Sequence, residues 1–161
     1  MIIVGIVGWK NSGKTYFASK IINKLKIKNY RVASIKHAHH EFDIDHKDTD
    51  SYIHREAGSS QVIVSSSKRW AKITELNNSK ELSLNDLLNQ LSEIDIVIVE
   101  GFKNDNHPKI EIIKKGNDDY LFKKISNIIA VVSEEKIYTD LKQFKKNEID
   151  NIVNFILEDK K

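Results

Sequence analysis

The chain has 161 residues, of which 40% are hydrophobic and 30% charged, and this composition is typical of one globular domain rather than a disordered chain. It contains no cysteine, which excludes disulfides, thiolate zinc sites and cysteine nucleophiles, and its net charge of +3 is too small to indicate nucleic-acid binding. No apolar run approaches the roughly 20 residues of a membrane span, and the opening MIIVGIVG lacks the basic start of a signal peptide, so we expect a cytoplasmic protein without membrane contact.

A strand and a helix are the first predicted elements. Residues 2–7 form a continuous apolar, β-branched run, as in a strand that is buried on both faces. A helical pattern follows from Lys14, with apolar residues recurring on one face: Phe17, Ala18, Ile21, Ile22 and Leu25. A second short strand at residues 31–36 completes a strand–helix–strand order, which favours a parallel sheet.

The rest of the chain continues the alternation of strands and helices. Further strands are predicted at residues 61–65, 70–76, 95–100, 109–113 and 128–132, and further helices at 51–57, 84–91 and 149–157. These patterns predict a three-layer α/β/α fold with a mainly parallel sheet, to which the hairpin-like strands of residues 61–76 make an antiparallel addition. With one proline and no linker, we expect a single domain over residues 1–161.

The segment Gly8 to Thr15, GWKNSGKT, matches the phosphate-loop pattern G-x-x-x-x-G-K-[ST] in full. Its glycines let the backbone curl so that N–H groups and a helix N-terminus surround phosphate oxygens. Lys14 is expected to reach the β and γ phosphates, and the Thr15 hydroxyl to bind Mg²⁺. The alternative is a glycine-containing turn that binds nothing. The position between an apolar strand and an amphipathic helix favours a P-loop NTPase.

A second acidic position follows the apolar strand of residues 95–100. In P-loop proteins such a strand lies beside the phosphate-loop strand, and its terminal acid faces the metal directly or through water. Because ligands gather at the carboxyl ends of parallel strands, Glu100 is better placed than Asp95. We therefore assign Glu100 and Lys14 as the catalytic residues and Thr15 and Glu100 as metal ligands. The alternative for Glu100 is a solvated glutamate at a strand end.

A polar segment after the second strand is crowded with possible ligands: His37, His39, His40, Asp43, Asp45, His46, Asp48 and Asp50. One interpretation is a transition-metal site, because histidine and carboxylate are suitable ligands. A second is a loop that positions substrate and supplies one aspartate, assigned here as Asp45, to Mg²⁺. A third is an exposed polar loop. Without a tight ligand spacing such as H-E-x-x-H, we favour the magnesium and substrate loop.

These motifs, taken in order, resemble the MobB family of molybdopterin-guanine dinucleotide biosynthesis adapter proteins. The resemblance extends from the first strand to about Val132. Besides the phosphate loop it rests on Lys36-His-Ala-His-His40, Asp43-Ile-Asp45, Asp50-Ser-Tyr52, Arg55 with Ala57-Gly58, Arg69-Trp-Ala71 with Thr74-Glu75, Val99-Glu-Gly-Phe-Lys103 and Lys109-Ile-Glu111. It implies a homodimer that binds GTP, hydrolyses it slowly and assists the guanylyltransferase that attaches GMP to molybdopterin. Two departures are Lys47-Asp48-Thr49, where the family often has Pro-Gly-Lys, and Ser133-Glu134, where Ser-Asp is usual.

The N-K-x-D motif with which GTPases recognise guanine is absent, so the expected preference for GTP over ATP rests on the resemblance. A carboxylate can accept the N1–H and N2–H₂ donors of guanine together, whereas adenine offers no such pair. Glu134, which follows the strand of residues 128–132, is the candidate reader; its alternative is a solvated acid in a turn. The nucleotide site is thus assigned to Gly8, Lys10, Asn11, Ser12, Gly13, Lys14, Thr15, Tyr16, Lys36, His37, Gly101 and Glu134.

Two other functions compete with a GTP-binding adapter. A P-loop small-molecule kinase also pairs a phosphate loop with a strand-end acid, but it usually has a basic lid, and this chain has only three arginines, Arg31, Arg55 and Arg69. A metallochaperone-type GTPase would use the histidines of residues 37–40. Metal analysis of the purified protein distinguishes that alternative.

Overall fold

The computed structural model describes residues 1–38 and 42–158, and the chain divides into two units. The first contains residues 1–37 and 84–158, and the second residues 38 and 42–83. The single nucleotide-binding domain expected from the sequence stays a prediction.

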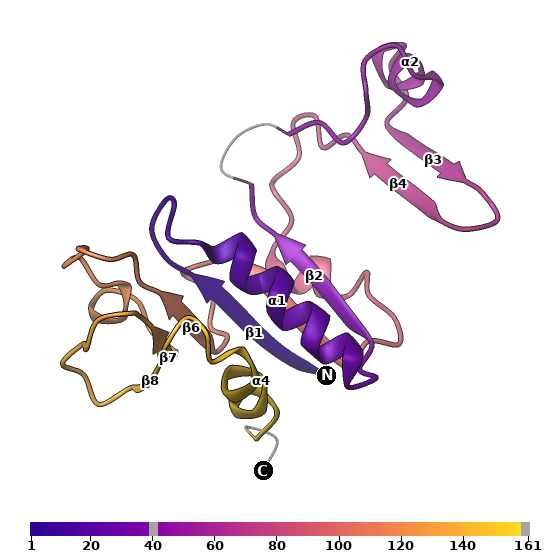
Figure 1. Cartoon of the computed structure of the whole chain (residues 1–161). Coiled ribbons are helices and arrows are strands. Elements are labelled where there is room, and N and C mark those ends of the chain that lie inside the picture. Colours follow the sequence, from indigo (N-terminus) through magenta and orange to yellow (C-terminus); the bar gives the residue numbers. More distant parts are fainter. Residues whose placement is uncertain (39–41, 159–161) are drawn as a thin grey trace. The chain divides into compact units, whose positions relative to one another are not determined.

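A six-stranded sheet in which all neighbouring strands are parallel forms the centre of the first unit (Figure 1). Its strands, in spatial order, are β2 (Val32–Lys36), β5 (Ile96–Glu100), β1 (Ile2–Val7), β6 (Lys109–Ile112), β7 (Ile128–Val132) and β8 (Lys142–Phe144). The predicted parallel sheet is confirmed. The sequence did not predict β8, because three residues are too few to show a periodic pattern.

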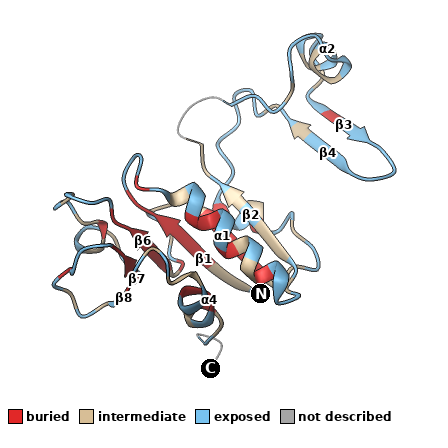
Figure 2. Cartoon of the chain, in the orientation of Figure 1, coloured by how far each residue is buried: buried red, intermediate tan, exposed pale blue. Residues whose placement is uncertain are grey.

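Helices cover both faces of this sheet, which confirms the three-layer fold. On one face, α1 (Lys14–Ile27) and α4 (Ile149–Glu158) pack on the side of Val4 and Ile6. The opposite face carries α3 (Leu84–Leu88) over Val97 and Val99, and the short 3₁₀ helix η1 (Leu121–Lys123) in a cluster with Val7. Figure 2 shows burial concentrated in the central strands, as expected for strands that are apolar on both sides.

Two charged residues of β6, Lys109 and Glu111, are buried on the face opposite to Ile110 and Ile112. Lys109 donates from Nζ to the backbone carbonyls of Asp105, His107 and Ser126, at 2.6, 2.9 and 3.3 Å. Glu111 accepts the two N–H groups that open η1, at 2.8 and 2.9 Å. Both side chains tie neighbouring turns to the strand, so the Lys109-Ile-Glu111 pattern has a structural role.

The second unit contains α2 (Asp50–Glu56) and an antiparallel hairpin of β3 (Gln61–Ser65) and β4 (Trp70–Thr74). The antiparallel addition is thus confirmed, as a separate two-stranded sheet. Among its described residues, Val62 is the one buried hydrophobic side chain. Within residues 1–38 and 42–158, no helix is long and apolar enough to cross a membrane.

Candidate functional site

The phosphate loop joins the end of β1 to the start of α1 in a tight curl. A Cβ atom at Gly8 would lie 2.5 Å from the carbonyl oxygen of Ile112 and 2.5 Å from Ser12 Oγ, so only glycine fits there. Gly13 and Asn11 adopt left-handed backbone conformations, with φ of 96° and 61°. The loop has the curled backbone that an anion-binding turn requires.

Two side chains of the loop are suited to a phosphate group. Ser12 is only 4% exposed, and its Oγ has no hydrogen-bond partner among the described residues. An unpaired buried hydroxyl is costly, and a bound anion would satisfy it. Lys14 is half-buried and reaches back over the loop, where its Nζ donates to the carbonyl oxygen of Trp9 at 2.9 Å.

The positive charge of Lys14 has two cationic neighbours, Lys103 and Lys36, and one acidic neighbour, Glu100. Burial, and next the positive charge of Lys103, lower the pKa of Lys14, while the charge of Glu100 opposes them and that of Lys36 adds to the lowering. A phosphate group placed here would relieve this repulsion. The residues present therefore fit a phosphorylated ligand.

Glu100 lies beside the phosphate loop because β5 pairs directly with β1, with Ile6 opposite Glu100. Its carboxylate accepts the Thr15 hydroxyl at 3.0 and 3.3 Å and lies 3.7 Å from the Lys36 ammonium. Hydroxyl and carboxylate oxygens are the ligands that Mg²⁺ prefers. These contacts bring together the two residues assigned to the metal, and their metal-binding role stays a prediction.

His37 follows β2 and Gly101 follows β5, so the two residues lie at the same edge of the sheet. The N–H of His37 donates to the carbonyl oxygen of Glu100 at 2.8 Å, and its ring stacks on Phe102 with 4.7 Å between centroids. Gly101 has a φ of 102°, and a Cβ atom there would lie 2.6 Å from His37 Cβ. The remaining assigned residues of the loop, Lys10 and Tyr16, are exposed.

Sequence reasoning missed a cluster of residues around Trp9. The indole Nε1 donates to the carbonyl oxygen of Asp119 at 2.5 Å, and the ammonium groups of Lys103 and Lys124 lie 5.0 and 5.5 Å from the ring centroid. Lys103 belongs to the Val99–Lys103 motif, but nothing in its spacing indicates that the chain turns back over the phosphate loop.

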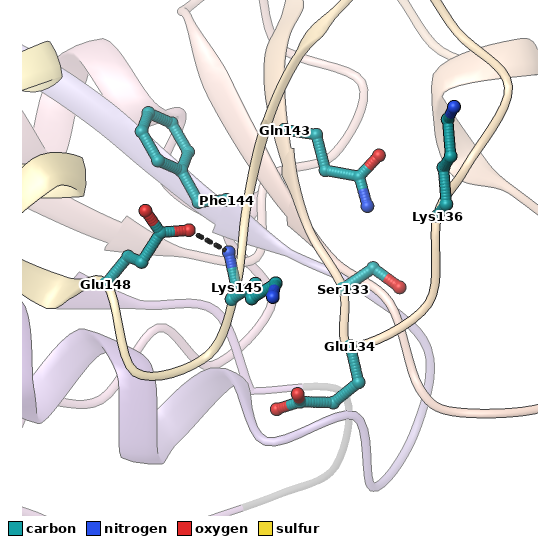
Figure 3. Close-up of a pocket in the computed structure, with 7 residues that line it drawn as sticks. All are labelled: Ser133, Glu134, Lys136, Gln143, Phe144, Lys145 and Glu148. Carbon is teal, nitrogen blue, oxygen red and sulfur yellow. Dashed lines mark hydrogen bonds between the residues drawn. The ribbon is translucent and has the colours of Figure 1, made fainter.

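Glu134 lies in a pocket of about 480 Å³ at the carboxyl ends of β7 and β8. Figure 3 shows that the lining comes from two stretches of chain, one after β7 and one in and after β8: Ser133, Glu134, Lys136, Gln143, Phe144, Lys145 and Glu148. The carboxylate of Glu148 already accepts the N–H of Lys145 at 2.7 Å, so it is less available to a ligand than that of Glu134. Glu134 is exposed to solvent.

Asp45 belongs to the second unit, where it is part of an ion-pair cluster around Arg55. Its carboxylate accepts from Ser51 Oγ at 2.8 Å and from Arg55 Nε at 3.1 Å, and Arg55 also pairs with Asp43 and Glu75. The assignment of Asp45 to Mg²⁺ stays a prediction. Of the histidine cluster, His39 and His40 lie outside the described residues, within which no group of three potential metal ligands is present.

The known proteins that this chain is similar to share one description. The family model of MobB, molybdopterin guanine dinucleotide synthesis protein B, matches residues 3–134. The chain belongs to the MobB family. The molybdopterin-guanine dinucleotide biosynthesis adapter protein of Escherichia coli K12 is 32% identical over 160 residues, covering 97% of this chain and 91% of the relative. The adapter protein of Haemophilus influenzae is 36% identical over 156 residues, covering 96% and 86%.

Solved MobB structures agree with the fold. The crystal structure of molybdopterin-guanine biosynthesis protein B superposes with a TM-score of 0.79 at 28% identity, covering 98% of this chain and 97% of that one. The Bacillus subtilis MobB structure also gives 0.79, at 26% identity and the same coverage. Asp48, in the polar segment between β2 and α2, has a left-handed backbone with φ of 69°. Aspartate tolerates that region better than most residues.

Proposed function

We propose that this MobB-family chain is a GTP-binding adapter in molybdopterin guanine dinucleotide biosynthesis, which assists the guanylyltransferase that attaches GMP to molybdopterin. The observation that carries nucleotide binding is the curled loop, with the unpaired Ser12 hydroxyl and the Lys14 ammonium beside the Thr15–Glu100 contact. In this proposal the loop binds the phosphates, and Thr15 and Glu100 hold Mg²⁺, which neutralises phosphate charge when bound.

Two of the three arginines of the chain are held in ion pairs, which supports slow hydrolysis rather than efficient phosphoryl transfer. Fast enzymes of this class use an arginine near the γ-phosphate. Arg31 pairs with Glu93 and Asp95 at the amino ends of β2 and β5, the edge opposite the phosphate loop, and Arg55 pairs with three carboxylates. The kinase alternative has no comparable observation in its favour.

Calorimetric titration with Mg²⁺ and either GTP or ATP, with and without molybdopterin, tests the proposal. We expect GTP to bind more tightly than ATP. We also expect molybdopterin to bind the protein or to increase its affinity for GTP. Failure of both nucleotides to bind the folded chain would overturn the proposal. Bound zinc or nickel in the purified protein would support the metallochaperone alternative instead.

Guanine selectivity is proposed to come from Glu134 in the pocket at the carboxyl ends of β7 and β8. Both strands end at the edge of the parallel sheet that carries the phosphate loop, where ligands of α/β sheets bind. Glu134→Ala is expected to weaken GTP about 10- to 100-fold, because a charged acceptor for two donors is lost, and to leave ATP within about threefold.

The matched control is Glu135→Ala, because Glu135 is adjacent in the chain but is not among the pocket-lining residues. The same titrations measure both variants. Equal changes in GTP and ATP affinity for Glu134→Ala, or an equal loss in Glu135→Ala, would mean that guanine is read elsewhere.

The homodimer implied by the family is proposed to form through the β3–β4 hairpin. Two strands alone are marginally stable in water, and Ile63 and Trp70 are 64% and 70% exposed on the same face of the hairpin. A second copy would cover these side chains and pair with a free strand edge.

Trp70→Glu is expected to convert a dimer into a monomer, because the interface would have to bury an unpaired charge. Sedimentation velocity measures the change, and Tyr138→Glu is the control, because Tyr138 is a 90% exposed aromatic of the first unit. A dimeric Trp70→Glu protein, or a monomeric wild type, would rule out this interface.

A further inference from the structure

An unusual turn carries the chain from β5 back over the phosphate loop. Gly101 and Phe102 follow one another in left-handed conformations, with φ of 102° and 47°. For a bulky residue such as phenylalanine this conformation is strained, and its ring is held by stacking on His37. Strain of this kind persists where the surrounding structure imposes it, often at binding sites, and here its result is the position of Lys103.

Lys103 is held against the same residue that Lys14 contacts. The Lys103 ammonium lies 5.0 Å from the Trp9 ring centroid, and the Lys14 ammonium donates to the Trp9 carbonyl oxygen at 2.9 Å. The Trp9 ring is itself anchored, through the hydrogen bond of its Nε1 to Asp119. Two ammonium groups thus meet at Trp9: Lys14, from the first turn of α1, contacts its carbonyl oxygen, and Lys103, from the turn after β5, lies over its ring.

Of the lysines around the phosphate loop, Lys36 and Lys124 are paired with carboxylates, whereas Lys103 adds a positive charge without such a pair among the described residues. Lys36 lies 3.7 Å from Glu100, and Lys124, also over the Trp9 ring, pairs with Asp119 at 2.5 Å. Within the described part of the chain, the half-buried Lys103 forms no ion pair with a carboxylate. Its charge also acts on the buried Glu111, but both oxygens of Glu111 already accept N–H groups of η1. Burial first, and then repulsion from Lys103, lowers the pKa of Lys14. An anion is the ligand that this arrangement of charges lacks.

We propose that Lys103 is a second phosphate-binding lysine, which makes the site prefer a nucleoside triphosphate over a diphosphate. The inference rests on the proposed binding of nucleotide to the phosphate loop. Lys103 follows Glu100 by three residues, on the side where Glu100 and Thr15 would hold Mg²⁺ and so neutralise the charge of the terminal phosphates. The ammonium therefore adds charge at the γ-phosphate end, where a triphosphate differs from a diphosphate.

The experiment measures Kd for GTP and GDP with Mg²⁺ on the full chain, for wild type, Lys103→Met and Lys124→Met. Lys124→Met is a matched control, because it removes an ammonium over the same ring that is already neutralised by Asp119. Lys103→Met is expected to weaken GTP about 10- to 30-fold and GDP less than about threefold, since a charge-assisted contact is lost only with the γ-phosphate. Lys124→Met is expected to change both by less than about threefold.

Two further readouts separate this role from a structural one. The melting temperature of nucleotide-free Lys103→Met is expected to equal or exceed that of wild type, because repulsion with Lys14 is removed, and Lys103→Arg is expected to restore the preference for GTP. Equal losses for GTP and GDP, or unchanged GTP affinity in Lys103→Met, would overturn the inference while leaving nucleotide binding intact. A wild type that binds neither nucleotide would instead overturn the proposed function and the inference with it.

Discussion

Replacement of Lys14 by alanine is expected to abolish tight GTP binding without unfolding the protein. The Lys14 ammonium donates to one exposed-loop carbonyl, that of Trp9, and belongs to none of the hydrophobic clusters, so little native packing is lost. Its contact with two phosphates would contribute about 1.5–3 kcal/mol or more, which is at least a 10- to 150-fold loss of affinity.

Removal of Lys14 also removes a burial cost. Burial and neighbouring cations lower the pKa of Lys14, so its charged form destabilises the folded protein. The alanine variant is therefore expected to melt at or above the wild-type temperature. Calorimetry and thermal unfolding measure the two effects. Lys26→Ala, at the end of α1 away from the loop, is the control. Wild-type GTP affinity in the folded Lys14→Ala protein would contradict the phosphate-loop assignment.

Glu100→Gln is expected to remove the Mg²⁺ dependence of nucleotide binding. Glutamine keeps the shape and can still accept the Thr15 hydroxyl, but it loses the charge that faces Thr15 and Lys36. Changes of a metal ligand or its close partner cost about 10- to 100-fold in metal affinity, so GTP affinity with Mg²⁺ should fall towards its value in EDTA, and hydrolysis should fall with it.

The measurement compares GTP titrations with Mg²⁺ and with EDTA for each variant. Glu93→Gln is the matched control, because Glu93 pairs with Arg31 at the opposite edge of the sheet and should keep the Mg²⁺ effect. An equal loss with and without Mg²⁺ in Glu100→Gln would show that this residue supports the loop without holding metal.

Local patterns were enough to predict the centre of the first unit. The apolar run of β1, the glycine-bounded loop and the amphipathic α1 are each formed by residues adjacent in the chain, and the structure has them with the same starts. Strands that are apolar on both sides imply burial between helices, which is why the parallel α/β/α arrangement was also predictable. MobB membership followed from the order of such motifs along the chain.

What depends on contacts between distant residues was decided by the tertiary structure. The approach of Lys103 to Trp9 requires two consecutive left-handed residues, and a left-handed Phe102 has no sequence signature because its own preference opposes it. The pocket around Glu134 depends on β8, whose three residues are ordered by pairing with β7 rather than by their own pattern. The separate second unit, with Arg55 among three carboxylates, likewise arises from pairings across 10 to 20 residues of chain. Residue identity alone thus determined which groups can bind phosphate, and the folded chain decided which of them meet, because charge and hydrogen bonding act through space and not along the sequence.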